Sequence, residues 1–265
     1  MAADTAPARV PARRPRLSRA DGVRLTVVVF FIALIELLCR AGVIAPSVMI
    51  APSAMAVHCL EILRAGTFDH DIAVSLGNIA AAAVLSVLLG FAAGVLLHAA
   101  PRARAAVEPL LSAYYAVPTF VFYPVFIVIL GVGAAPIIAI AVLLAVVSMV
   151  TATLNGLDRI PRSLHKTAQV LRLSPLQSAL RIKLPAALPY LFTGVKLSVA
   201  YAFIGVIASE FILSGEGLGY AIGYAYNNFQ NDDMYALMFL VLVLVTAINM
   251  ALNIVDRRLQ ARRRR

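Results

Sequence analysis

Residues 109–157 read PLLSAYYAVPTFVFYPVFIVILGVGAAPIIAIAVLLAVVSMVTATLNGL, and these 49 residues include no Lys, Arg, Asp or Glu. A transmembrane helix needs about 20 consecutive apolar residues, so the run is long enough for two spans. The turn-forming stretch GVGAAP divides it. The sequence therefore predicts membrane-spanning helices at about residues 107–130 and 137–157, and Pro118 and Pro124 are expected to kink the first of them.

The composition of the whole chain is that of a membrane protein. Hydrophobic residues make up 62% of the 265 residues and charged residues 14%, whereas soluble domains have about 25% charged residues. Four further apolar runs predict four more spans, at about residues 25–44, 72–97, 188–213 and 235–255. The expected fold is an all-α membrane protein with six transmembrane helices. Its membrane domain covers residues 25–256, between a disordered basic tail at 1–24 and a second basic tail at 257–265.

Basic residues are concentrated on one side of this predicted topology. With six spans both chain ends lie on the same side, and that side receives 20 of the 23 Lys and Arg residues. Loops that carry an excess of Lys and Arg face the cytoplasm. Both termini are therefore predicted to be cytoplasmic. The net charge of +10 follows from this topology and does not indicate nucleic-acid binding. The C-terminal tail can also contact anionic membrane lipids.

A polar segment, residues 158–187, separates the fourth and fifth predicted spans. It contains KTAQVLRLSPLQSALRIKLP at residues 166–185. Ser174 and Gln177 have the spacing of a capping box, so a second short helix is expected to begin there and to end before Pro185. The sequence predicts two helices joined by a tight turn on the cytoplasmic face. The segment is either an ordinary loop at the lipid surface or a docking site for a cytoplasmic partner.

This segment resembles the EAA loop of bacterial ATP-binding-cassette (ABC) importer permeases. The family pattern is Glu-Ala-Ala, three residues, Gly, nine residues, Ile, one residue, Leu-Pro, and this chain keeps that spacing. The resemblance assigns the following positions to contact with an ATPase: Lys166, Thr167, Ala168, Arg172, Leu173, Ser174, Pro175, Ile182, Leu184 and Pro185.

Further stretches look like the nitrate, sulfonate and taurine subgroup of these permeases, which includes importers of thiamine precursors. They are Pro118 with Pro124, the run LPAALPYLFTGVKLS at residues 184–198, and Glu210 with Gly217-Leu218-Gly219. The resemblance covers most of the chain. It implies the type I ABC importer permease fold, with six spans in each subunit and a cytoplasmic coupling-helix loop.

The resemblance also implies a function: the transmembrane permease subunit of an ATP-driven importer in the bacterial inner membrane. Its expected partners are cytoplasmic ABC ATPase subunits, an extracytoplasmic solute-binding protein and a second, identical permease subunit. The expected solute is a small organic or inorganic anion (a sulfonate, taurine or nitrate) or a molecule similar to a thiamine precursor. The chain lacks the P-loop pattern GxxxxGK[ST], so ATP and Mg are expected on the partner ATPase, and the permease itself is expected not to be an enzyme.

Two residues depart from the family pattern. Lys166 occupies the position of the family's Glu, which reverses a charge at the expected ATPase interface. Arg172 occupies the position of the family's Gly, which permits a left-handed turn; a non-glycine residue in that conformation costs about 1–2 kcal/mol. Three explanations remain open: compensating changes in the ATPase, weak coupling, or pairing with a different permease that couples normally.

Polar residues inside the predicted spans are candidates for the solute pathway, because polar groups are costly against lipid. Tyr115, Thr119 and Tyr123 stand four apart and are expected to share one face of a helix. The full set of candidates is Tyr115, Thr119, Tyr123, Lys196, Ser198, Tyr201 and Ser209. Helix packing also favours small and hydroxyl-bearing residues, so these positions could equally be structural.

Glu210, Gly217 and Gly219 form a separate group of candidates. Glu210 is expected near the outer end of the fifth span, where it could hold the following segment SGEGLGYAIGYAYNNFQNDDM, a predicted loop. This group is a candidate outer gate. Lys196 is equally consistent with a structural anchor and with a solute contact.

Two other classes of membrane protein remain as alternatives. A stand-alone secondary transporter would function without an ATPase and is typically built from inverted repeats, for which the sequence gives no convincing sign. An integral-membrane enzyme would need clustered His, Asp or Glu at membrane depth. The two cysteines and four scattered histidines indicate neither a disulfide framework nor a metal site.

Overall fold

The structure is a computed structural model that describes residues 19–263, and the described chain is almost entirely helical. The chain separates into two compact units, residues 1–55 and 56–265. Residues 1–18 of the predicted disordered tail lie outside the described residues. Residues 19–24 are helical, contrary to that prediction, because α1 already begins at Arg19.

The first unit contains α1 (Arg19–Arg40) and the first turn of α2 (Pro52–Ala65). The Glu36 carboxylate accepts a hydrogen bond from Arg40 Nε at 2.5 Å, and residues four apart on a helix are placed for such a pair. It also accepts hydrogen bonds from the backbone N–H of Ser53 at 3.0 Å and from the Ser53 hydroxyl at 2.6 Å. Glu36 therefore fixes the start of α2 against the end of α1.

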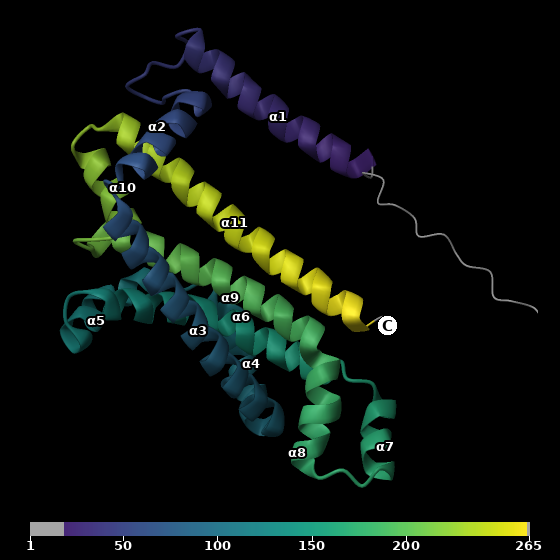
Figure 1. The fold of residues 1–265 in the computed structure, drawn as a ribbon. Coiled ribbons are helices and arrows are strands. Elements are labelled where there is room, and N and C mark those ends of the chain that lie inside the picture. Colours follow the sequence, from purple (N-terminus) through teal and green to yellow (C-terminus); the bar gives the residue numbers. More distant parts are fainter. Residues whose placement is uncertain (1–18, 264–265) are drawn as a thin grey trace, which may run out of the picture. The chain divides into compact units, whose positions relative to one another are not determined.

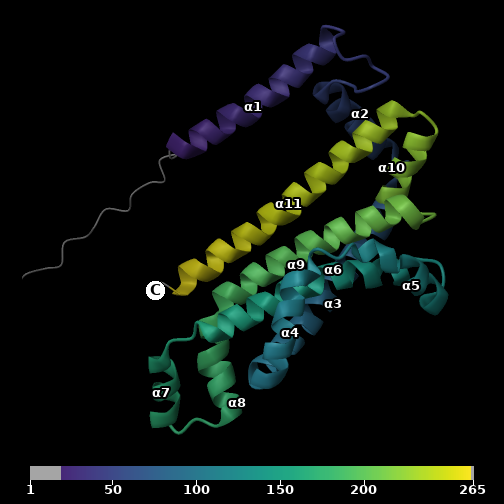
Figure 2. The ribbon, with the colours of Figure 1, turned by 180° about the vertical axis from the view of Figure 1, so that it is seen from behind.

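The second unit contains the remaining helices, which Figures 1 and 2 show from opposite sides. In chain order they are α3 (Asp69–Ala99), α4 (Pro101–Tyr114), the 3₁₀ turn η1 (Thr119–Phe122), α5 (Tyr123–Leu130), α6 (Ala134–Asp158), α7 (Arg162–Val170), α8 (Pro175–Ser178), the π-helical turn η2 (Ala179–Lys183), α9 (Leu184–Leu213), α10 (Leu218–Asn227) and α11 (Asn231–Arg263). Helix α6 packs against both α3 and α9 and is the most buried of the long helices.

Glycines allow these three helices to approach closely. A Cβ on Gly90 of α3 would lie 2.7 Å from Met149 Cβ of α6, and a Cβ on Gly94 would lie 2.6 Å from Thr153 Cβ. Gly90 and Gly94, which stand four residues apart, therefore both face α6. On the other side of α6, a Cβ on Gly205 of α9 would lie 2.7 Å from the Cα of Ala141. Small residues in membrane helices permit such close packing, which gives dispersion contacts that lipid cannot replace.

The predicted third span, residues 107–130, is not one kinked helix. The chain runs through α4, leaves helical geometry at residues 115–118, and continues through η1 and α5, with a bend of 102°. Val117 precedes Pro118, and the residue before a proline avoids the α-helical region. Pro118 itself has ψ of 96°, which is extended backbone. The break is therefore larger than the expected proline kink.

The number of spans agrees in part with the prediction. Among the described residues, four helical segments are long and apolar enough to cross a membrane, or five if the bent α4–α5 pair counts as one. The first predicted span corresponds to α1, which ends at Arg40 instead of residue 44. The count of six spans stays a prediction.

Two further sequence predictions are wrong. The second helix of the polar segment does not end before Pro185, because α8, η2 and α9 form one continuous helical segment, Pro175–Leu213. The π-helical turn lies just before the proline, which lacks an N–H donor. Figure 1 shows that α8 and α9 run in different directions. The segment after α9, predicted as a loop, contains α10, which begins after Gly217 and packs its small residues on α9.

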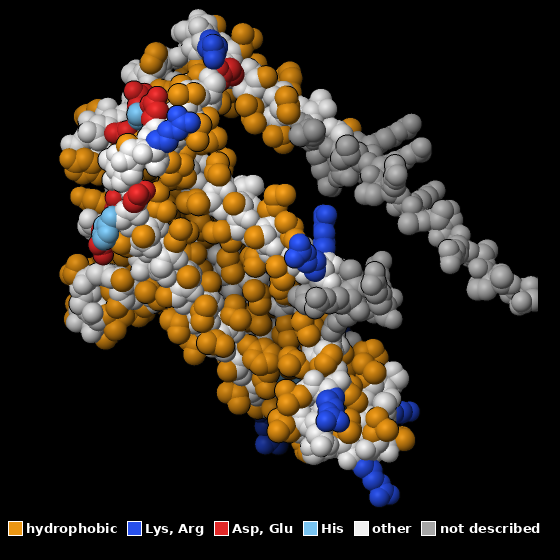
Figure 3. Space-filling view, in the orientation of Figure 1, with side chains coloured by type: hydrophobic (Ala, Val, Ile, Leu, Met, Phe, Trp, Pro, Cys, Tyr) orange, Lys and Arg blue, Asp and Glu red, His pale blue; other side chains and the backbone are white. Residues whose placement is uncertain are grey.

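Charged side chains are separated between the two ends of the second unit. The start of α4, the residue that follows α6 and the α7–α8 hairpin carry Lys and Arg, whereas the starts of α3 and α11 and the loop before α10 carry Asp, Glu and His. Figure 3 shows apolar side chains covering the flank between the acidic end and the basic end. This arrangement is typical of a membrane protein with two water-exposed ends.

We predict that Gly205→Ala lowers the free energy of unfolding by about 1–3 kcal/mol, because the added methyl group meets backbone atoms of α6 that cannot move aside. Thermal unfolding of the detergent-solubilised protein measures the change. Gly77→Ala is the matched control: no described atom lies within 4 Å of the added Cβ, and alanine favours the helix by up to about 1 kcal/mol. Equal effects of the two substitutions would contradict the assignment of Gly205 to a close helix contact.

Candidate functional site

The α7–α8 hairpin is the first candidate site, and its turn is built around Arg172. The N–H of Leu173 donates to the carbonyl of Ala168 at 3.1 Å, and the N–H of Arg172 donates to the carbonyl of Gln169 at 3.0 Å. These bonds are those of a helix C-terminus closed by a left-handed residue. Arg172 has φ of 47°, so it adopts the left-handed conformation that its position in the family pattern requires. A residue with a Cβ is strained there.

The start of α8 has the predicted capping box. The N–H of Gln177 donates to the Ser174 hydroxyl at 3.2 Å, and the N–H of Ser174 donates to the Gln177 side chain at 3.1 Å. Pro175 occupies the first turn, where its missing N–H is not needed. The cap fixes the direction in which α8 leaves the turn.

The hairpin exposes apolar side chains next to basic ones. Val170 is 82% exposed and Leu176 is 69% exposed, although both lie on ordered helical turns. Ala168 is buried, whereas Lys166 and Thr167 are exposed on α7. Exposed apolar side chains on a rigid element are typical of a protein interface. Leu173, Ile182, Leu184 and Pro185 are half-buried at the base and turn of the hairpin.

The second candidate site is the broken span, where the structure separates three predicted pathway residues. Tyr115 caps the end of α4, Thr119 begins η1 and Tyr123 begins α5, so they do not share one helix face as expected. Tyr115 is 48% exposed, and its ring lies 5.9 Å from the ring of Tyr201 on α9. Thr119 is buried with no hydrogen-bond partner for its hydroxyl among the described atoms.

The remaining predicted pathway residues contact other helices. The Tyr123 hydroxyl donates to the carbonyl of Leu213 at 2.7 Å. Ser198 is buried and lies 2.9 Å from Ser148 of α6, hydroxyl to hydroxyl. Ser209 is also buried, and no described atom hydrogen-bonds with its hydroxyl. In this conformation Ser198 and Ser209 lie within helix packing, and Tyr115 and Tyr201 are the more accessible.

Lys196 forms an ion pair that sequence reasoning did not find. Its Nζ donates to Asp256 Oδ2 of α11 at 2.7 Å and lies 3.4 Å from Asn253 Oδ1. The pair joins α9 to α11 within the apolar part of the chain, where a charge needs a partner. Asn253 and Asp256 stand three residues apart on the last span, so they share one face of that helix. This polar face could have indicated a partner for Lys196.

The candidate gate residues lie together at the other end of α9. Glu210 is fully buried, and its Oε2 accepts hydrogen bonds from the Ser75 hydroxyl at 2.5 Å and from the N–H of Gly219 at 3.2 Å. Its Oε1 accepts one from Asn78 Nδ2 at 3.2 Å. Three helices, α3, α9 and α10, therefore meet at one carboxylate. Ser75 and Asn78, three residues apart on α3, were not predicted.

The two gate glycines allow this approach. Gly217 has φ of 100°, and a Cβ there would lie 2.5 Å from the Glu210 carboxyl carbon. A Cβ on Gly219 would collide with the backbone of α9 at Ile207 and Phe211. The N–H of Gly217 also donates to Asp71 Oδ1 at 2.8 Å. Both glycines are thus needed to seat the start of α10 on the buried carboxylate.

His58 joins α2 to the start of α11 at the same end of the unit. Its Nε2 lies 2.8 Å from Asp233 Oδ1 and its Nδ1 lies 3.1 Å from Glu61 Oε2. The hydrogen bond with Asp233 raises the pKa of His58 above its ordinary value, and Glu61 adds to the effect. Within residues 19–263, no three side chains of the metal-binding types are placed to hold a metal ion.

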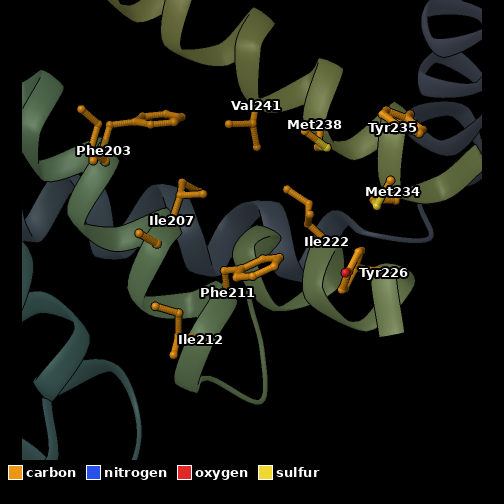
Figure 4. Close-up of a pocket in the computed structure, with 12 residues that line it drawn as sticks. Phe203, Ile207, Phe211, Ile212, Ile222, Tyr226, Met234, Tyr235, Met238 and Val241 are labelled. Atoms are coloured by element: carbon orange, nitrogen blue, oxygen red, sulfur yellow. The ribbon is translucent and has the colours of Figure 1, made fainter. Parts of the chain in front are cut away.

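An apolar cavity of about 700 Å³ lies between α9, α10 and α11. Figure 4 shows its side chains pointing toward one another from the three helices. Apart from the hydroxyls of Tyr226 and Tyr235, its lining residues carry no polar side chain, so the cavity does not suit a polar solute. The labelled lining residues are Phe203, Ile207, Phe211, Ile212, Ile222, Tyr226, Met234, Tyr235, Met238 and Val241.

Residues 86–265 match the family described as "Binding-protein-dependent transport system inner membrane component". A "Probable ABC transporter permease protein" from Haemophilus influenzae is 31% identical over 71% of this chain and 76% of its own length. The "Putative aliphatic sulfonates transport permease protein SsuC" of Bacillus subtilis is 27% identical over 79% of this chain and 75% of its own length. The "Nitrate import permease protein NrtB" of Leptolyngbya laminosa is 28% identical over 57% of this chain and 54% of its own length.

The fold is similar to that of a solved membrane transporter. A chain of the MetNI methionine ABC transporter in an inward-facing conformation superposes with a TM-score of 0.61, over 70% of this chain and 93% of that chain. The two sequences are 22% identical, so this similarity concerns the fold alone.

We predict that Glu210→Ala lowers the free energy of unfolding by about 3 kcal/mol or more, because it leaves buried donors of Ser75, Asn78 and Gly219 without an acceptor. Thermal unfolding in detergent measures the loss. Glu216→Ala is the matched control, since this carboxylate is exposed in the neighbouring loop and lies 3.3 Å from the exposed His70 side chain. A loss of the same size in both variants would contradict the central role of Glu210.

We predict that Arg172→Gly stabilises the α7–α8 turn by up to about 1 kcal/mol, because glycine adopts the left-handed conformation without strain. Amide hydrogen exchange of the hairpin should slow accordingly. Leu171→Gly is the control: Leu171 has φ of −77°, so glycine relieves no strain there and only adds freedom to the unfolded chain. Faster exchange in Arg172→Gly would show that the arginine side chain stabilises the turn by other contacts.

Proposed function

Because the chain belongs to the inner membrane components of binding-protein-dependent transport systems, the permease subunits of ABC importers, we propose that it transmits ATP-driven movement to a solute pathway. ATP and Mg are bound by separate ATPase subunits, which dock on the α7–α8 hairpin. An extracytoplasmic binding protein delivers the solute at the opposite end. A second copy of the permease completes the pathway.

The observation that carries this proposal is the α7–α8 hairpin. Its turn is ordered by a capping box at Ser174 and by backbone hydrogen bonds around Arg172, yet it exposes Val170 and Leu176. A loop that merely connects two spans has no need of exposed apolar side chains. The basic end of the molecule, which carries the hairpin, is assigned to the cytoplasm by the excess of Lys and Arg. The ATPase is a cytoplasmic partner, so the assignment of the hairpin to the ATPase interface agrees with the cytoplasmic assignment of the basic end.

The break between α4 and α5 supports a pathway beside it. Residues 115–118 are non-helical and exposed within one chain. Non-helical backbone at membrane depth is tolerated only where it is covered by protein or lines a water-filled cavity. We therefore assign this surface to the pathway between two permease copies, with Tyr115 and Tyr201 among the residues that line it. The Glu210 cluster, at the other end of α9, is the outer gate.

The solute class rests on the relatives. Their names describe import of nitrate, bicarbonate and aliphatic sulfonates, which are all small anions. We propose a small anion for this chain as well, with a thiamine-precursor-like molecule as the alternative within the same family. Lys196 is neutralised by Asp256, so the pathway attracts an anion through hydroxyl and backbone donors more than through this lysine.

The tagged chain, purified in mild detergent after expression with its genomic neighbours, should retain stoichiometric ATPase subunits. Leu176→Asp should reduce this association by about tenfold or more, because the interface would bury an unpaired charge. Val132→Asp is the control, since Val132 is equally apolar and is exposed in the loop between α5 and α6, away from the hairpin. Transport by the purified chain without any ATPase would overturn the proposal and favour a secondary transporter.

A further inference from the structure

Asp158 lies at the junction between the membrane helices and the α7–α8 hairpin. It is the last residue of α6, and α7 begins four residues later at Arg162. Its carboxylate accepts two hydrogen bonds from Arg104 of α4, Nη1 to Oδ1 at 2.8 Å and Nη2 to Oδ2 at 2.7 Å. His98, at the end of α3, lies 3.3 Å from the same carboxylate. A two-bond arginine–carboxylate pair fixes orientation as well as distance.

Helix α4 depends on polar contacts for its position. None of its described residues is buried, and Val107 and Leu111 are only half-buried, so apolar packing contributes little to its position. One end is held by the pair between Arg104 and Asp158. The other end is held by the Tyr114 hydroxyl, which donates to the carbonyl of Leu143 on α6 at 3.0 Å.

A polar cleft of about 230 Å³ lies between these two attachments. The α4 residues that line it recur at helical spacing and share one face of the helix. From α4 they are Arg104, Glu108, Leu111 and Ser112, followed by Tyr115 at the C-terminal cap, and from α6 they are Thr151, Leu154 and Asn155. The cleft separates the two helices where close packing would otherwise join them. The ends of α4 are therefore its points of attachment to α6.

The other side of the hairpin base is packed tightly. The Arg159 guanidinium lies 5.3 Å from the centre of the Tyr190 ring on α9. A Cβ on Gly156 would lie 3.1 Å from Tyr190 Cβ and 3.4 Å from Ala187 Cβ. The end of α6 is thus held to α9 by direct packing, whereas it is held to α4 by an ion pair across a cleft. When the hairpin base is displaced, the packing contacts move α9 and the ion pair between Arg104 and Asp158 moves α4.

We propose that Arg104 and Asp158 are positioning residues that transmit movement of the coupling hairpin to α4, and through α4 to the broken span beside the pathway. The inference rests on the proposed function, because it requires an ATPase that moves the hairpin. According to this inference, the ion pair makes α4 move together with the hairpin base during transport. The exposure of the break at residues 115–118 then changes. Without the pair, the hairpin and α9 still move, but α4 does not follow.

The test uses the complete transporter, that is, the permease with its co-purified ATPase subunits in liposomes. Ser112→Cys places a single thiol in the cleft, after Cys39→Ser and Cys59→Ser remove the native ones. The rate of labelling by a water-soluble maleimide is measured without nucleotide and after trapping with MgATP and vanadate. ATP hydrolysis is measured in parallel, because it reports whether the hairpin is docked.

In the otherwise unaltered chain the two labelling rates should differ by about fivefold or more, because the exposure of the cleft differs between the two states. Asp158→Asn and Arg104→Gln should abolish the difference while ATP hydrolysis continues. The exchanged pair, Arg104→Asp with Asp158→Arg, should restore it. Arg102→Gln is the control, since Arg102 is an exposed arginine on the same turn of α4 and should leave the difference unchanged.

The inference would be overturned if Asp158→Asn keeps the labelling difference. It would also be overturned if the exchanged pair assembles and hydrolyses ATP but shows no labelling difference. If Asp158→Asn does not assemble, Arg104→Lys decides: it keeps the charge but loses the two-bond geometry, and an unchanged difference would overturn the inference. Failure of the proposed function gives another result, namely no co-purified ATPase and no effect of MgATP with vanadate on the unaltered chain.

Discussion

The close approach of α3 and α9 to α6 is the constraint on which the second unit depends. Lipid tails solvate apolar side chains as well as protein does, so burial alone cannot hold membrane helices together. Gly90 and Gly94 bring α3 to one side of α6, and Gly194 and Gly205 bring α9 to the other. The positions of the hairpin, the Glu210 cluster and the break all follow, because each lies at an end of one of these three helices or beside it.

A buried carboxylate has the complementary role at the far end of α9. Glu210 accepts hydrogen bonds from α3 and from the start of α10, so it specifies how the segment after α9 folds back. A buried polar cluster of this kind is costly when a member is missing and confers a single arrangement when complete. Small residues thus determine how the helices pack, and polar residues determine which ends are joined.

The sequence predicted the helical fold, the hairpin with its capping box, and the association of Glu210 with Gly217 and Gly219, because each depends on neighbours close in the chain. The left-handed conformation of Arg172 followed from the family pattern. The sequence did not predict the 102° break, the helix α10, or the partners Ser75, Asp158 and Asp256. Those features depend on contacts between helices distant in sequence, which periodicity and local propensity do not contain. The roles of the pathway residues stay predictions.

The continuity of α8 with α9 has a consequence for protein engineering. The family pattern ends at Leu184 and Pro185, which makes that position an attractive boundary for exchanging coupling loops between related transporters. In this chain a boundary there would cut a single helical segment, Pro175–Leu213, immediately after its π-helical turn. A one-residue change in that turn rotates everything on one side of it by about 100° relative to the other. Chimeras should therefore be joined between α7 and α8, at Leu173 and Ser174, which belong to neither helix.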